Sequence, residues 1–136
     1  MSLFERSGMI LQPEEKVIKQ GKCEGKVPGG EKLGIKYGIR GGLVKKIQWN
    51  EVKGEMVLTN KRVLVLGEKG RLRKEVVPYL DLELGSIKAV TTSKPLVGKE
   101  KMSLSVDLGT GKLEIMEFKM DDAPGWVSTI RGQIVS

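Results

Sequence analysis

Short apolar runs separated by glycine-rich turns make up most of the chain. The clearest run places Met102, Leu104, Val106 and Leu108 at every second position, with other residues between them. Successive side chains of a strand point to opposite faces, so this alternation predicts a strand with one buried face. Eighteen glycines punctuate such runs. The pattern predicts a mainly β domain of about seven to eight antiparallel strands between residues 14 and 120.

The stretch GEMVLTNKRVLVL (54–66) contains two apolar runs around a polar centre. The runs predict two strands. Thr59, Asn60 and Lys61 predict the turn between them, because Asn tolerates the left-handed conformation that tight hairpins use. A second turn over 67–70 leads into a strand expected over 71–77, which Pro78 should end. A separate strand is expected from the alternation over 80–84.

A lysine-rich stretch precedes this hairpin. Apolar residues over 32–40 alternate strictly with basic residues and glycines, which predicts a strand with one apolar and one basic face. Two glycines at 41–42 predict a turn, and 43–49 a returning strand. The run after residue 112 is less regular. Leu113 and Ile115 are odd-numbered, whereas Met116, Phe118 and Met120 are even-numbered. A β-bulge near residues 115–116 would account for this change of parity.

The C-terminal segment has a helical pattern. Trp126, Ile130 and Ile134 recur at every fourth position and share one helix face. Asp121 or Asp122 can cap the N-terminus, and Pro124 suits the first turn. We therefore predict one amphipathic helix over about 122–135 that closes the sheet by burying its apolar face.

Charge adds a possible ligand class. The chain has 136 residues, which fits a single domain over 1–136, and its net charge is +7. A positive surface favours anionic partners, although dispersed lysines are also typical of a solvated surface. Abundant Lys and Glu with few Asn and Gln are typical of thermophilic proteins. The candidate residues for anion or lipid binding are Lys32, Lys36, Arg40, Lys45, Lys46, Lys61, Arg62, Arg71, Arg73 and Lys74.

Enzyme chemistry finds little support. The chain has no His and a single cysteine, Cys23, so the commonest general base and the Cys–His pair are both missing. We expect no catalytic residue, cofactor or metal, and Cys23 as a part-buried strand residue. One cysteine favours a reducing compartment, so we expect a cytoplasmic location, peripheral at the inner membrane face if the ligand is lipid. The longest stretch without charged residues, 123–130, is too short to span a membrane. Six aromatic residues do not favour nucleic acid as a partner.

Five segments together are similar to a known family. They are LQPEEKVIKQG (11–21), GEMVLTNKRVLVL (54–66), LDLELGSIKAV (80–90), LSVDLGTGKLEIMEF (104–118) and DDAPGWVSTIRGQI (121–134). In this order they resemble the pleckstrin-homology (PH) superfamily, in its GRAM and bacterial PH-like branch. Residues 26–53 depart from the pattern, because this stretch is longer than the family has before the Thr-Asn hairpin.

The resemblance implies a strongly bent β-barrel closed by a C-terminal helix and a docking role without catalysis. Two functions then stand side by side. One is protein binding or self-assembly through exposed strand edges and the 26–53 segment. The alternative is peripheral docking on anionic lipid through the basic candidates, which neighbouring hairpins could bring to one rim. The basic residues are spread along the chain, so we favour the first.

Overall fold

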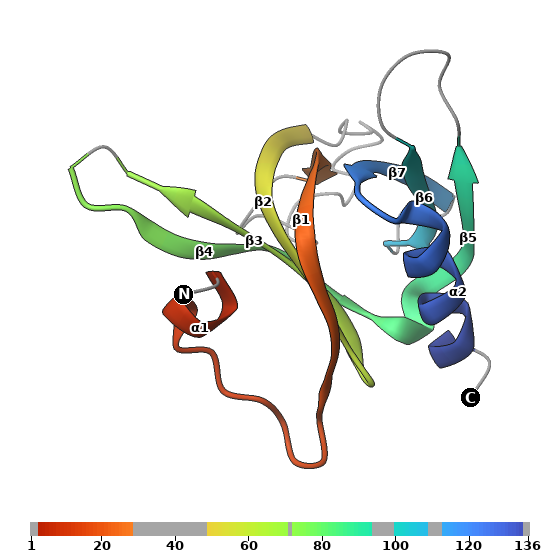
Figure 1. The fold of residues 1–136 in the computed structure, drawn as a ribbon, viewed down its shortest axis with the longest axis horizontal. Helices are drawn as coiled ribbons and strands as arrows, with labels where there is room; N and C mark the ends of the chain where they lie inside the picture. The colour runs from red at the N-terminus through yellow and green to blue at the C-terminus, as the bar shows by residue number, and fades with distance from the viewer. Residues whose placement is uncertain (1–2, 29–48, 71, 94–99, 109–112, 135–136) are drawn as a thin grey trace, which may run out of the picture.

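The computed structural model describes residues 3–28, 49–70, 72–93, 100–108 and 113–134. These residues form one antiparallel sheet and two α-helices (Figure 1). The strands are β1 (Val17–Pro28), β2 (Trp49–Thr59), β3 (Arg62–Lys69), β4 (Glu75–Glu83), β5 (Ile87–Ser93), β6 (Lys101–Asp107) and β7 (Leu113–Met120). The helices are α1 (Leu3–Ser7) and α2 (Ala123–Ile134), and a 3-10 helix, η2 (Leu84–Ser86), links β4 to β5.

The strand order in this sheet is β4-β3-β2-β1-β7-β6-β5. Sequential hairpins build β1–β4 and β5–β7, and β1 joins the two halves by pairing with β7. In the described part of the chain β4 and β5 are the ends of the sheet, so the barrel is bent but not closed by hydrogen bonds. Helix α2 packs on β5 and β6, as Figure 1 shows. The expected mainly β fold with one C-terminal helix is confirmed.

The main core lies between the concave face of the sheet and α2. The helix contributes Ala123, Trp126, Val127 and Ile130, all buried in the same cluster as Phe118 of β7. This is the face that the four-residue spacing predicts, and it is buried because a single amphipathic helix has one apolar stripe to cover. Cys23 is also buried here.

A second apolar cluster lies on the other face of the sheet. Val57 of β2 and Leu64 and Leu66 of β3 are buried there under Leu3, Phe4 and Met9. Strands β2 and β3 are thus covered on both faces where they pair, which explains why the runs 56–58 and 63–66 are continuously apolar rather than alternating. Helix α1 was not expected from the sequence, because five residues are too few for a periodic pattern.

Two expectations about strands were wrong. Strand β4 runs through Pro78, which was expected to end a strand, so it includes residues of both strands that were expected over 71–77 and 80–84. Because β4 is an edge strand in the described sheet, Pro78 needs no partner on its outer side, and the register shifts between Val65 and Leu66 opposite it. The expected bulge in β7 is absent too: β7 pairs with β6 in one unbroken register. The expected strands over 32–48 lie outside the described residues.

Candidate functional site

The turn after β2 is held by side chains rather than by a left-handed residue. Asn60 does not have a positive φ, contrary to the expectation. Instead its Oδ1 accepts a hydrogen bond from the backbone N–H of Lys16 at 2.7 Å, and its Nδ2 donates to the carbonyl of Glu14 at 3.0 Å. The Thr59 hydroxyl accepts hydrogen bonds from the N–H groups of Lys61 and Arg62, both at 3.0 Å. The turn therefore also holds the segment before β1.

Arg62 lies inside an ion-pair network. Its Nε donates to Oε2 of Glu15 at 2.8 Å, and its Nη1 donates to Oδ2 of Asp81 at 2.9 Å. Burial alone raises the pKa of Glu15, but hydrogen bonds from Arg62, Thr59 and the Gln12 N–H outweigh it and lower the pKa to about 2. The Arg62 charge is thus balanced by two carboxylates of the chain itself. The Leu-Thr-Asn-Lys-Arg segment is a structural clamp in this protein.

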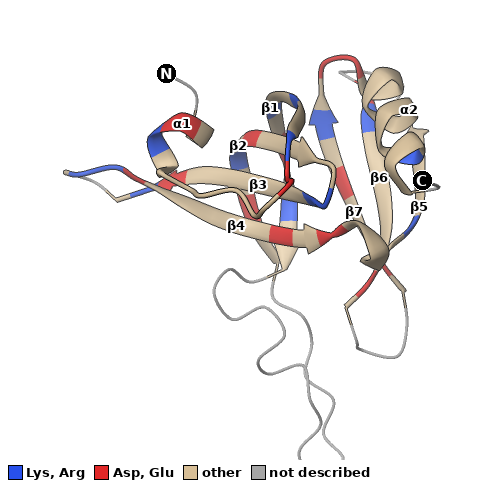
Figure 2. Cartoon of the chain, turned by 90° about the horizontal axis from the view of Figure 1, so that it is seen from below, with Lys and Arg blue, Asp and Glu red and all other residues tan. Residues whose placement is uncertain are grey.

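The basic candidates do not gather on one rim. Lys61 is exposed at the start of β3, whereas Arg73 and Lys74 are exposed beyond its end, at the outer tip of the β3–β4 hairpin (Figures 1 and 2). Consecutive hairpins turn at opposite ends of the strand they share, so an eight-residue β3 holds them roughly 25 Å apart. The single-rim expectation is therefore wrong for these residues. The remaining candidates lie outside the described residues: Lys32, Lys36, Arg40, Lys45, Lys46 and Arg71.

Neither catalysis nor metal binding gains a candidate from the described residues. Burial, with a smaller effect from the charge of Glu55, raises the pKa of the Cys23 thiol to about 12. Such a thiol stays protonated and unreactive at neutral pH. No group of three or more acidic or cysteine side chains in the described segments is placed to hold a metal ion. None of the helices in these segments is long and apolar enough to cross a membrane.

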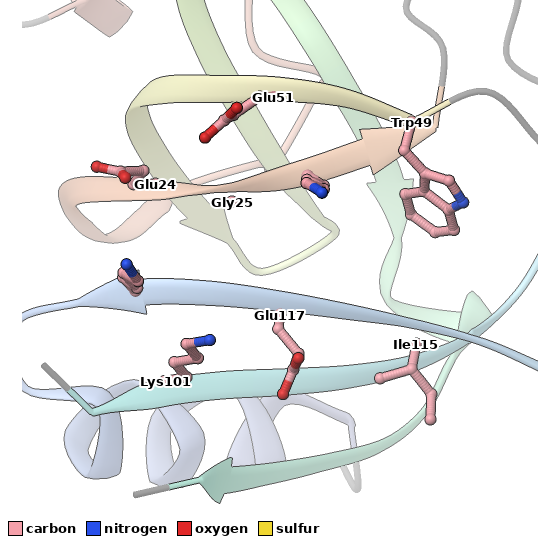
Figure 3. Close-up of a pocket in the computed structure, with 9 residues that line it drawn as sticks. Glu24, Gly25, Trp49, Glu51, Lys101, Ile115 and Glu117 are labelled. Atoms are coloured by element: carbon pink, nitrogen blue, oxygen red, sulfur yellow. The ribbon is translucent and has the colours of Figure 1, made fainter. Parts of the chain in front are cut away.

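A groove of about 480 Å³ opens where the two halves of the sheet meet. Strands β1 and β7 pair only from Cys23 to Gly25 and from Phe118 to Met120. Beyond Gly25 the two strands separate, and Figure 3 shows the outward side chains of both halves along the opening. Gly25 marks the closest approach, because a Cβ there would overlap the carbonyl oxygen of Glu117. The sheet itself therefore creates the groove.

The far end of the groove is apolar and exposed. Trp49, the first residue of β2, is 37% exposed, and Ile115 of β7 is 63% exposed. Figure 3 shows both at the same end of the opening. Leu113, 54% exposed, lies on the same outward face of β7 as Ile115. Exposed apolar groups gathered in one place mark interaction surfaces more often than scattered ones do.

The rest of the groove is charged but balanced. Its lining includes three lysines and three glutamates: Lys26, Lys101, Lys119, Glu24, Glu51 and Glu117. A larger hollow of about 720 Å³ lies beside α1, but two of the apolar residues that line it, Cys23 and Met120, are buried. Among the described residues, the β1–β7 groove combines an opening with the exposed apolar side chains of Trp49 and Ile115, so it is the candidate site.

The sequence contained one signal of this groove. The parity change in β7 places Leu113 and Ile115 on the face opposite Met116 and Phe118. An unbroken strand with apolar residues on both faces must either be covered twice or expose some of them. Trp49 gave no such signal, because only the folded sheet brings the start of β2 close to β7.

Comparison with known proteins identifies the fold. No protein-family model matches the chain, and no curated protein sequence does. The PH domain of Slm1, solved with phosphoserine, superposes with a TM-score of 0.52 at 21% identity, over 88% of this chain and 97% of that one. The DH/PH domains of PDZ-RhoGEF, solved with GTP-γ-S-activated RhoA, give a TM-score of 0.53 at 13% identity over 97% of this chain.

The DH/PH domains of p115-RhoGEF give a TM-score of 0.50 at 12% identity over 90% of this chain. This chain spans only 32% of the PDZ-RhoGEF chain and 31% of the p115-RhoGEF chain. At these identities the likeness concerns the fold. The chain has a PH-like fold, as its motif order indicated.

Proposed function

We propose that this PH-like chain is a non-enzymatic interaction module whose ligand is a protein, bound in the β1–β7 groove. The observation that carries the proposal is the exposed pair formed by Trp49 and Ile115 at one end of the groove. Tryptophan is enriched among the residues that dominate binding energy at protein interfaces. Aliphatic residues beside it supply apolar area whose burial favours association.

The balanced charge of the groove supports a protein ligand over a phosphate-bearing one. Glu24, Glu51 and Glu117 line it together with the lysines. The groove as a whole carries as many carboxylates as ammonium groups, so its net charge does not favour a ligand whose charges are all negative. A protein segment carries side chains of both signs and can match such a surface.

Light scattering and sedimentation of the purified chain over a salt series test this function. We expect either a salt-resistant oligomer or binding to a protein ligand that persists at about 0.5 M salt, where charges are screened within a few ångströms. An Ile115→Asp variant should lose that association and keep its fold, because Ile115 is exposed. Association that disappears in salt and ignores Ile115→Asp would refute the proposal.

Anionic lipid remains the second candidate, favoured by one specific observation. The outer tip of the β3–β4 hairpin carries Lys69, Arg73 and Lys74, all exposed (Figure 2). Each basic residue near an anionic membrane contributes about 1 kcal/mol. The docking would therefore be weak and sensitive to salt.

Co-sedimentation with phosphatidylserine-containing and pure phosphatidylcholine vesicles tests the lipid candidate. The informative variants are Arg73→Glu/Lys74→Glu at the tip and Lys61→Glu at the opposite end of β3. Arg62 is left intact because its substitution would break the ion pairs with Glu15 and Asp81. Salt-sensitive binding to the anionic vesicles alone, lost in the tip variant, would support lipid docking. No binding at low salt would exclude it.

A further inference from the structure

The outward residues around the groove form cross-strand rows of distinct chemistry. In the first row, Lys53 of β2 is the register partner of Glu24 of β1, which in turn pairs with Lys119 of β7, and Lys119 pairs with Lys101 of β6. The row thus contains three lysines and one glutamate. Lys101 and Lys119 lie directly opposite each other, and like charges in that position are destabilising. The row favours an acidic side chain above it.

The second row has the opposite balance. Two residues further along each strand, Glu51 of β2 is the register partner of Lys26 of β1, and Glu117 of β7 is the partner of Ser103. The Ser103 hydroxyl donates a hydrogen bond to Glu117 at 3.3 Å. Two carboxylates and one ammonium group remain, so this row favours a basic side chain.

The third row is apolar. Trp49 is the register partner of Pro28, and Ile115 is the partner of Ser105. Leu113 continues the outward face of β7 two residues beyond Ile115. Along β7 the outward side chains therefore change from a lysine to a glutamate and then to two exposed aliphatic residues.

The spacing of these rows matches one kind of ligand. Alternate residues of a strand are about 6.6–6.8 Å apart, and every second side chain points to the same face. An extended peptide that lies along β7 presents its own alternate side chains at the same interval. A compact ligand, such as a phosphorylated headgroup, can match one row but not the sequence of three.

We infer that the β1–β7 groove binds an extended segment of a partner protein, with an acidic residue over the lysine row, a basic residue two positions on, and aliphatic residues at the next alternate positions, against Trp49, Ile115 and Leu113. The inference rests on the proposed function, because it specifies which protein segment the same groove accepts. Charge complementarity row by row sets the order of the ligand, and the apolar end provides most of its affinity.

Selection from a displayed library of random nine-residue peptides against the immobilised full chain tests the inference. Enriched peptides should contain an acidic, a basic and an aliphatic residue at alternate positions in that order along one direction. Affinity of a synthetic enriched peptide is then measured by fluorescence polarisation. Ile115→Asp should weaken it at least tenfold. Leu72→Asp is the matched control, because Leu72 is fully exposed outside the groove and should leave affinity unchanged.

A charge swap provides the sharper test. Lys119→Glu/Lys101→Glu should weaken the enriched peptide, and a peptide whose acidic residue is replaced by lysine should regain affinity for that variant. Quenching of tryptophan fluorescence by iodide tests whether the peptide binds beside Trp49. Trp126 is 2% exposed, so Trp49 dominates the quenching, and bound peptide should protect it.

Three results would overturn the inference. No enrichment, or enriched peptides indifferent to Ile115→Asp, would remove the groove as a peptide site while a salt-resistant oligomer still supported the proposed function. Self-association without peptide that Ile115→Asp abolishes would make a second copy the occupant. Binding to phosphatidylserine vesicles that Lys119→Glu/Lys101→Glu abolishes, without peptide binding, would refute the proposed function as well.

Discussion

The buried carboxylate of Glu15 binds the guanidinium of Arg62 through two hydrogen bonds, across 47 residues of sequence. Nε lies 2.8 Å from Oε2, and Nη2 lies 3.1 Å from Oε1. Such bidentate pairs combine charge with fixed geometry. This pair fastens the segment before β1 to the β2–β3 hairpin, beside the hydrogen bonds that Asn60 makes to the same segment.

Removing the arginine should be costly. Arg62→Leu would leave the Glu15 carboxylate buried with only neutral partners, and breaking a buried pair in this way costs about 3–5 kcal/mol. Urea denaturation of the variant and the parent protein measures the loss. Lys61→Ala, at the neighbouring exposed position, is the control and should change stability by less than about 0.5 kcal/mol. Equal stabilities of the Arg62→Leu variant and the parent would mean that the pair contributes nothing.

The free energy of unfolding should also depend on pH between about 4.5 and 2, because of Glu15. The pKa of Glu15 is lowered to about 2 in the folded protein, from 4.5 in the absence of these contacts. Its contribution is therefore complete above about pH 4.5 and is lost as the pH falls toward 2. The difference in unfolding free energy between the parent and Glu15→Gln, measured by urea melts from pH 7 to pH 2.5, should shrink across this window. A difference that stays constant down to pH 2.5 would contradict the assignment.

The C-terminal helix should depend on Trp126. The side chain is 2% exposed in the main core, and Lys19 Nζ lies 5.4 Å from its ring centroid. Trp126→Ala should cost about 3–5 kcal/mol, the usual range for deleting a buried aromatic residue. Ser128→Ala, on the exposed face of the same helix, provides the comparison in denaturant melts. If both variants melt like the parent, α2 is not docked on the sheet.

Gly25 should tolerate no side chain. A Cβ at this position would meet the Glu117 carbonyl oxygen and the Phe118 ring, at the crossing of β1 and β7. Forcing extra volume into a packed site costs about 1–3 kcal/mol, so Gly25→Ala should lower the midpoint of thermal unfolding. Gly85→Ala is the matched control, because no atom lies within 4 Å of a Cβ there. A Gly25→Ala protein as stable as the Gly85→Ala protein would show that the strands can separate without cost.

Local patterns of apolar and polar residues predicted much of the fold. The alternation in β6 and the four-residue spacing of Trp126 and Ile130 each specify which face is buried, because a strand and a helix repeat with fixed periods. The hairpin around residues 59–62 followed from two apolar runs and a turn sequence. These features depend on residues near one another in the chain, so the sequence alone determined them.

Relationships between distant segments were decided by the tertiary structure. From the sequence, Arg62 was predicted to be an exposed basic residue. The folded chain places Glu15 and Asp81 beside it. Pro78 was predicted to end a strand. The sequence does not show that β4 is an edge strand of the sheet, where a missing backbone N–H is tolerated. Ile115 was predicted to lie at a β-bulge. In the structure the register between β6 and β7 is unbroken, and the Ile115 side chain points outward.

The groove depends on the same kind of information. Its rows combine residues of β1, β2, β6 and β7 that are up to 95 positions apart in the sequence, as Glu24 and Lys119 are, and strand pairing alone brings them together. Composition determined that the chain is basic. The fold determined where that charge lies, because each strand's direction and register fix which side chains face one another across the opening between β1 and β7.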